Sequence, residues 1–411
     1  MPDPERTPDS PQGNPSALAL GTIAFTLCFY AWALLGPLGP DLQDQLGLSD
    51  TQLALTVSIP VVLGSLMRIP LGVLTDRYGG RRVFTMLMAF TPIPLIGLAL
   101  FNDSWGAVLV FGFLLGFTGA SFAVGVPFVN GWYPKSRQGF ALGIYGMGMG
   151  GTVLGALTAP RIVDLTNIDV PFWIAAALLA VMSVVFWTMA EDAPGTGTGK
   201  DGSMFAPLRV FTGEGAGRAW ALTLFYFMAF GGFVAMFLYL PKLLVDVHDL
   251  SKTDAGARAA GFALLAVLAR PVGGTLSDRV GARRVLIASF VGTAVLALGL
   301  ALGYKTMVPL TIFCLTMAIF LGLGTGAVFK LVPEWFPAQV GAVTGVVGAA
   351  GGLGGFFPPL VMALVKSATG SYWLGFALMA AVATAALVVL LSVGRAGSPA
   401  GGESEETLAA T

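Results

Sequence analysis

Two related stretches mark an internal duplication, the first being Arg68-Ile-Pro-Leu-Gly-Val-Leu-Thr-Asp76-Arg77-Tyr-Gly79-Gly-Arg81-Arg82. The second is Arg270-Pro-Val-Gly-Gly-Thr-Leu-Ser-Asp278-Arg279-Val-Gly281-Ala-Arg283-Arg284, at an offset of 202 residues (270 − 68) in a chain of 411. Each version ends an apolar segment in a short charged turn. Each also carries one arginine among apolar residues, eight positions before its aspartate. The repeat predicts a chain built from two similar halves.

The composition excludes a water-exposed globular fold. Hydrophobic residues make up 55% of the chain and charged residues only 11%, whereas soluble proteins carry about 25% charged residues. The formal net charge is zero, so nothing in the charge balance indicates nucleic-acid binding. His248 is the only histidine, and Cys28 and Cys314 lie in separate apolar segments. We therefore expect no metal site, no cofactor and no histidine-based catalysis.

Twelve apolar segments are long enough to cross the ~30 Å hydrocarbon core, which takes about 20 helical residues. We predict an all-α membrane protein with 12 transmembrane helices in two pseudo-symmetric six-helix halves. The predicted spans are 16–38, 52–74, 83–101, 105–129, 139–161, 171–190, 219–241, 256–276, 283–303, 308–331, 340–365 and 372–393. The predicted organisation is a disordered N-terminal tail (1–15), a first half (16–190), a cytoplasmic linker (191–218), a second half (219–393) and a C-terminal tail (394–411).

The distribution of lysine and arginine predicts the orientation in the membrane. If both termini and the linker face the cytoplasm, thirteen of these residues lie on that side and six on the other. An excess of positive charge on the cytoplasmic side is the general rule for membrane proteins. We therefore expect a multi-pass protein of the cytoplasmic (inner) membrane, a monomer in the lipid bilayer, with both termini in the cytoplasm.

The Asp-Arg-x-Gly-x-Arg-Arg turns resemble the loop between helices two and three of the major facilitator superfamily, and the resemblance covers the whole chain. The resemblance implies the major facilitator fold, and the residue types of these turns independently permit a gating role. The aspartate can accept hydrogen bonds from arginines and from helix-end amides, which would latch the cytoplasmic side in one conformation. The alternative is a positively charged membrane anchor with no gating role. The residues concerned are Asp76, Arg77, Arg81, Asp278, Arg279 and Arg283.

The two repeated arginines are the candidate substrate ligands. Arg68 lies about 12 Å along a helix from Asp76, near the middle of the bilayer, and the repeat places Arg270 at the same depth. An arginine there costs about 2.5–3.5 kcal/mol and stays protonated. Every Asp and Glu falls in a tail, a loop or a segment end, so the simplest partner is an anionic substrate. Alternatively, either side chain could extend toward the headgroups or bond backbone carbonyls of a neighbouring helix.

Two glycine-rich segments indicate the size and the identity of the expected substrate. Their glycine spacing of three and four residues permits close helix packing and favours a small substrate, although tight packing alone also explains it. Residues 341–356 resemble the second signature of the nitrate/nitrite porter family, and residues 141–151 resemble the first. The resemblance implies that Arg68 and Arg270 grip the planar anion. It also places Phe122, Tyr226, Gly148, Met149 and Gly351 at the substrate site.

One residue departs from the family pattern. The first signature usually carries an asparagine that touches the substrate, and this chain has Met149 instead. The loss of that amide could favour nitrite or another small monoanion. Aromatic residues such as Phe122 and Tyr226 are also common in plain helix packing. Lys330 lies close to Glu334 at a segment end, where we expect an ion pair rather than a substrate ligand.

These features predict a secondary active transporter rather than an enzyme. The carrier would move nitrate, nitrite or both by alternating access of its two halves around the arginine pair. Uptake of a monoanion against an inside-negative potential costs about 2.3 kcal/mol per 100 mV, so it requires coupling to protons or to an exiting anion. Two arginines without an anion between them should resist closing, which favours exchange of nitrate for nitrite. The alternative cargo is cyanate, formate or chlorate.

Overall fold

The computed structural model describes residues 13–134, 137–196, 206–213, 215–336 and 340–393. The C-terminal tail, most of the N-terminal tail and part of the linker therefore lie outside the described residues. Within the described part, 12 helical spans are long and apolar enough to cross a membrane. The predicted all-α fold class and the number of spans are confirmed.

Several spans are made of two helices joined by a short turn. The first half comprises α1 (Pro15–Ala33), α2 (Gly39–Leu46), α3 (Asp50–Leu66), α4 (Arg68–Tyr78), α5 (Gly80–Phe90), α6 (Pro92–Leu100), α7 (Trp105–Leu115), η1 (Gly116–Ala120), α8 (Ser121–Asn130), α9 (Gln138–Gly146), η2 (Met147–Gly150), α10 (Gly151–Leu165) and α11 (Asp169–Met189). The linker contains the short helix η3 (Ala206–Phe211). The second half comprises α12 (Ala216–Tyr226), the π-helical turn η4 (Phe227–Gly231), α13 (Gly232–His248), α14 (Lys252–Val280), α15 (Ala282–Gly303), α16 (Met307–Trp335), α17 (Val340–Leu353), α18 (Phe357–Thr369) and α19 (Trp373–Val393).

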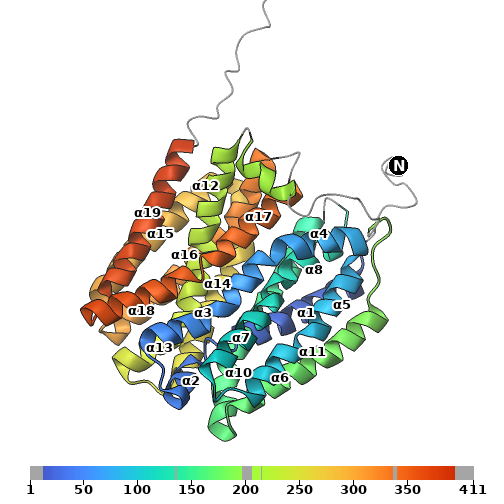
Figure 1. Ribbon diagram of the computed structural model, residues 1–411. Helices are drawn as coiled ribbons and strands as arrows, with labels where there is room; N and C mark the ends of the chain where they lie inside the picture. Colours follow the sequence, from blue (N-terminus) through green and yellow to red (C-terminus); the bar gives the residue numbers. More distant parts are fainter. Residues whose placement is uncertain (1–12, 135–136, 197–205, 214, 337–339, 394–411) are drawn as a thin grey trace, which may run out of the picture.

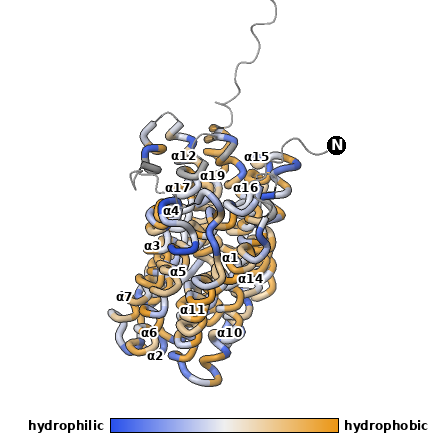
Figure 2. The backbone as a smooth tube through the Cα atoms, turned by 90° about the vertical axis from the view of Figure 1, so that its right-hand side faces the viewer, coloured by the Kyte–Doolittle hydropathy of each residue, from blue (hydrophilic) through white to orange (hydrophobic). Residues whose placement is uncertain are grey.

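The two halves stand side by side as two helical bundles (Figure 1). Helix α3 of the first half packs against α17 and α18 of the second, and α10 packs against α14. Hydrophobic residues cover the length of the bundle, while hydrophilic residues gather toward its two ends (Figure 2). This is the distribution that a protein surrounded by lipid requires, since the hydrocarbon core cannot hydrogen-bond polar groups.

The two copies of the repeated stretch fold alike at the turn and differently at the arginine. Gly79 and Gly281 both have positive φ, 86° and 89°, a conformation that glycine adopts without steric cost. Just before Arg68, the span breaks at Met67, between α3 and α4. Pro70 accounts for the break, because its ring clashes with the carbonyl four residues earlier. Helix α14, by contrast, runs through both Arg270 and Pro271 without interruption.

Ion pairs join the halves at the end of the bundle opposite the linker. Asp50 at the start of α3 lies 3.3 Å from Lys242 and 3.0 Å from Lys366 of the other half. Lys252 at the start of α14 lies 2.9 Å from Asp41 of α2. Burial raises the pKa of the Asp41 carboxyl, and the Lys252 ammonium opposes that shift. Between described residues, no ion pair joins the halves at the linker end. Ion pairs between the halves therefore hold the end opposite the linker closed, and we refer to it as the closed end.

Candidate anion site between the halves

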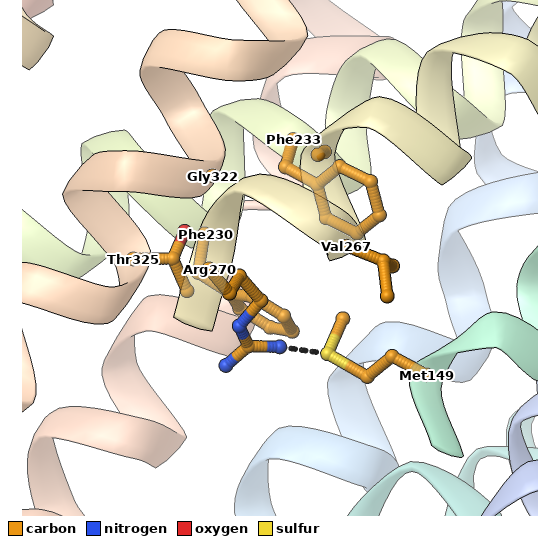
Figure 3. Close-up of a pocket in the computed structure, with 8 residues that line it drawn as sticks. Met149, Phe230, Phe233, Val267, Arg270, Gly322 and Thr325 are labelled. Atoms are coloured by element: carbon orange, nitrogen blue, oxygen red, sulfur yellow. Dashed lines mark hydrogen bonds between the residues drawn. The ribbon is translucent and has the colours of Figure 1, made fainter. Parts of the chain in front are cut away.

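Each repeated arginine reaches across the interface to the other half. Arg68, the first residue of α4, is only 6% exposed, and its Nη1 donates a hydrogen bond to the Gly348 carbonyl in α17. Arg270 of α14 directs its Nη1 to the Met149 sulfur in η2 (Figure 3). Both guanidinium groups therefore lie where the halves meet. Both side chains point across the interface between the halves rather than along their own helices toward an end of the bundle.

The two guanidinium groups share one aromatic ring. The Phe230 ring centroid lies 5.2 Å from the Arg68 Cζ and 5.8 Å from the Arg270 Cζ. Cations at such distances are attracted to the ring face. The two arginines are also close enough to repel each other. Phe230 thus partly compensates two like charges that the sequence places in the membrane interior.

Neither arginine is paired with an acid among the residues that the structure describes. Within the described residues, the hydrogen-bonding partners of the two side chains are the Gly348 carbonyl and the Met149 thioether, and none of the ion pairs includes either arginine. The buried Nε of Arg68 has no hydrogen-bond partner. An unsatisfied buried donor of a charged group is costly. The alternative in which an arginine bonds a backbone carbonyl of a neighbouring helix is thus found for Nη1 of Arg68. A carbonyl oxygen carries no net charge, so this bond does not neutralise the guanidinium.

A narrow pocket lies beside Arg270. Eight residues line it, among them Met149 of η2, Phe230 of η4 and Thr325 of α16 (Figure 3). The other five are Phe233, Ala266, Val267, Arg270 and Gly322. The lining is apolar apart from the guanidinium and the Thr325 side chain. The pocket is too narrow to admit a water molecule in this conformation, so an anion could enter it only after the lining residues move apart.

The predicted aromatic residues belong to one chain of rings. Tyr226 is 1% exposed and stacks on Phe230, with centroids 5.1 Å apart and planes at 3°. Phe329 of α16 lies 4.7 Å from the Tyr226 ring and 6.4 Å from the ring of Phe122. The structure thus places Tyr226 at the arginine pair, whereas Phe122 also packs against Phe25 of α1 at 5.8 Å.

Sequence reasoning missed Phe230 and Phe329. For Phe230 a signal was available, because it follows Tyr226 by four positions and so shares its face of a helix. The π-helical turn that contains Phe230 is a feature often found at functional sites. For Phe329 there was no comparable signal, since its place between Phe122 and Tyr226 depends on how α16 packs.

The second glycine signature makes room for the site. A Cβ atom at Gly351 would lie 1.9 Å from Cδ1 of Tyr226, and one at Gly352 would lie 2.2 Å from Oγ of Ser65. Gly348 supplies the carbonyl that Arg68 binds. Gly354 lies close to Gly231, and a Cβ atom added to Gly231 would lie 2.5 Å from the Cα atom of Gly354. The contacts of Gly351 and Gly352 explain why α17 requires glycine where it faces Tyr226 and Ser65.

The first signature is used differently. A Cβ atom at Gly148 would lie 2.5 Å from the ring of Phe25, so Gly148 serves the packing of η2 on α1. Met149 is 2% exposed and takes the position in front of Arg270. Of the predicted residues, Arg68, Arg270, Tyr226, Met149 and Gly351 therefore come together, and Gly148 lies to one side.

The charged turns fasten each half to its own last helix. Arg81 donates from its backbone N–H to Asp192 at 2.8 Å and from its guanidinium to the Trp187 carbonyl at 2.6 Å. Arg283, its counterpart, reaches the Leu391 carbonyl of α19 at 3.4 Å. These contacts hold each turn against the last helix of its own half.

The aspartates of the two turns differ in their partners. Asp278 forms an ion pair with Lys330 at 2.5 Å, within the second half. The predicted ion pair of Lys330 thus forms, with Asp278 as the partner. Asp76 is exposed, and no described residue donates a hydrogen bond to it. Gating by Asp76, Arg77 and Arg279 stays a prediction.

The site and the fold define a membrane carrier with two six-helix halves and a cationic centre. Comparison with known proteins agrees. The family model "Major Facilitator Superfamily" matches residues 21–258 and 246–410. The human organic anion transporter MFSD10 (TETRAN) has the same fold, with a TM-score of 0.74 at 16% identity, over 92% of this chain and 100% of that one.

Several proteins with higher sequence identity match this chain over most of their length. The "Probable nitrate/nitrite transporter NarK2" of Mycobacterium tuberculosis is 42% identical over 379 residues, 91% of this chain and 95% of the relative. The "Nitrite extrusion protein" of Bacillus subtilis is 37% identical, over 91% of this chain and 93% of the relative. The "Probable nitrate/nitrite antiporter NarK1" of Thermus thermophilus is 36% identical, over 86% and 85%. The chain belongs to the nitrate/nitrite porter family of the major facilitator superfamily, which consists of transporters and not enzymes.

Proposed function

We propose that this protein carries nitrate, nitrite or both across the cytoplasmic membrane, with the anion bound between Arg68 and Arg270. The observation that carries this proposal is the pair of guanidinium groups at the interface with no acidic partner among the described residues. A planar monoanion would accept the donors that the chain leaves unused. Guanidinium suits this role because it is planar, permanently charged and able to donate two parallel hydrogen bonds.

Transport would proceed by alternating access. Ion pairs close the end opposite the linker, which is the arrangement expected of a carrier open or opening toward the linker side. The excess of lysine and arginine on that side supports a cytoplasmic linker and cytoplasmic termini. The bound anion would screen the repulsion between the arginines and allow the halves to close around it.

Exchange of nitrate for nitrite is the coupling that the site supports best. The arginines repel each other, so a carrier that returned empty would have to bring two unscreened cations through the closed state. Proton symport is the alternative. It requires a titratable group at the site, and Lys330, the one candidate from the sequence, is 43% exposed and paired with Asp278.

Counterflow in proteoliposomes tests both the substrate and the coupling. Vesicles loaded with nitrite should take up labelled nitrate at a high initial rate, and vesicles loaded with an impermeant buffer should take up almost none. Equal uptake in the two cases would rule out obligatory exchange. A competition series with cyanate, formate and chlorate would reveal another cargo, if one of these displaced nitrate more strongly than nitrite does. Met149 is the reason to consider another cargo, because a thioether stands in front of Arg270 where the family pattern has an amide donor.

A further inference from the structure

A second cationic pair lies at the closed end, and a carboxylate of the chain occupies it. Asp50 is the first residue of α3. Its Oδ1 lies 3.3 Å from Nζ of Lys242 in α13, and its Oδ2 lies 3.0 Å from Nζ of Lys366 in α18. Gln43 of α2 donates a further hydrogen bond to Oδ1 at 3.1 Å. Each oxygen of one planar anion is thus bound by a different lysine.

The two lysines are held in place by their own half. Asp246 of α13 forms ion pairs with both Lys242 and Lys366. The Tyr372 hydroxyl donates to the same carboxylate at 2.8 Å, and burial raises the pKa of Tyr372, which keeps it a donor. The Lys366 ammonium also lies 5.1 Å from the centre of the Tyr372 ring. These contacts do not involve the first half, so they can survive when the halves separate.

Opening of this end must remove Asp50 from the pair. The carboxylate belongs to α3 of the first half, and the lysines belong to the second half. An anion that enters from this side can pass only when the halves have moved apart. The two lysines then retain one negative partner, Asp246, for two positive charges. The pair would be left with one net positive charge at the mouth of the transport path.

We propose that Lys242 and Lys366 form an outer anion site, which Asp50 fills in the closed state and an external small oxyanion fills in the open state. Asp50 is then a built-in competitor of the substrate. A carboxylate and nitrite both present two oxygens on one planar centre, so the same two ammonium groups serve either. This inference rests on the proposed function, because it requires a transported anion.

The test compares substitutions on the two sides of the same ion pair. Initial rates of labelled nitrate uptake are measured in right-side-out vesicles at varied external nitrate, with saturating internal nitrite. Lys366→Gln should raise the external KM about tenfold, the effect of losing one charge-assisted hydrogen bond. Asp50→Asn should lower the external KM about threefold, because the competitor loses its charge. Lys242→Gln is the second lysine variant, in case one of them does not fold.

Two comparisons separate an anion site from a plain mechanical gate. If the pair only closed the gate, breaking it from either side would shift the same equilibrium, and KM would move in one direction in all variants. The internal KM, measured with varied internal nitrite, should stay within about twofold of wild type. Lys305→Gln is the matched charge control, because Lys305 is exposed near the same end. It should leave the external KM unchanged.

The outcomes are distinct. Opposite shifts of the external KM in the aspartate and lysine variants support the site. Shifts in the same direction, lysine variants that behave like Lys305→Gln, or an equal rise of the internal KM would each overturn it. A wild-type protein that transports neither nitrate nor nitrite would refute the proposed function, and with it this inference.

Discussion

The two repeated arginines occupy matching positions in the sequence and different environments in the structure. Arg68 begins a new helix at a break and is bound to the Gly348 carbonyl, beside the glycine face of α17. Arg270 lies within an unbroken helix and faces the Met149 thioether and an apolar pocket. The repeat thus places the same charge in both halves, but the two guanidinium groups differ in their cross-half partners, a backbone carbonyl for Arg68 and a thioether for Arg270.

The largest effect should come from Arg68→Lys and Arg270→Lys. Lysine keeps the charge and loses the planar fork. Each loss of one or two charged hydrogen bonds should lower kcat/KM for nitrate roughly 10- to 100-fold. Counterflow with each variant measures this. Arg68→Lys should also lower thermal stability, because it removes the bond to Gly348, whereas Arg270→Lys should not. Equal stability in the two variants would contradict the assigned difference between them.

Glycine substitutions should affect nitrate binding in the second signature and stability in the first. Gly351→Ala would force a Cβ atom to within 1.9 Å of Tyr226, displace the ring beside Arg68 and lower nitrate affinity about tenfold or more. Gly345→Ala is the matched control, because an added Cβ there meets nothing within 4 Å. Gly148→Ala should instead destabilise the protein by displacing Phe25, with little change in KM. Nitrate binding and melting temperature of the purified variants distinguish these cases.

Met149→Asn should test how the partner of Arg270 affects anion binding. The amide would give the first half a hydrogen-bond donor in front of Arg270, which the thioether does not provide. An added hydrogen bond contributes a net of about 1 kcal/mol, so nitrate affinity should rise by roughly fivefold and the preference for nitrate over nitrite should increase. Met149→Leu keeps the volume without the amide and should match wild type. An unchanged anion preference in Met149→Asn would show that this position does not contact the substrate.

The smallest effect should follow loss of the ion pair between Lys330 and Asp278. Both side chains are largely exposed, 43% and 58%, and exposed ion pairs contribute about 0–1 kcal/mol. Lys330→Gln should therefore change the rate of nitrate exchange by less than about fivefold. A complete loss of transport would instead point to a role of Lys330 in coupling, as proton symport would require.

The sequence was sufficient for the parts of this protein that local pattern determines. Apolar segment length predicted the 12 spans, and the repeated charged turns predicted the duplicated halves. The absence of mid-span acids predicted that neither Arg68 nor Arg270 would have a carboxylate partner. Each of these follows from the physics of a lipid environment acting on short stretches of chain.

The remaining features depend on tertiary packing between distant segments. The bond of Arg68 to Gly348 spans 280 residues, and no local pattern signals it. Phe230 contacts both arginines only because η4 is positioned at the interface. The pairing of Asp50 with Lys242 and Lys366 was equally hidden, since charges at segment ends look like ordinary solvated residues. Sequence alone could name Arg68 and Arg270 but not their partners, and it did not point to the pair of Lys242 and Lys366.

The most direct test of the central claim is anion binding by the purified protein in detergent. Isothermal titration with nitrite and nitrate should give one saturable site in wild type, weakened at least tenfold in both Arg68→Lys and Arg270→Lys, and unchanged in the control Gly345→Ala. Wild-type affinity in either arginine variant would contradict an anion held between the two guanidinium groups.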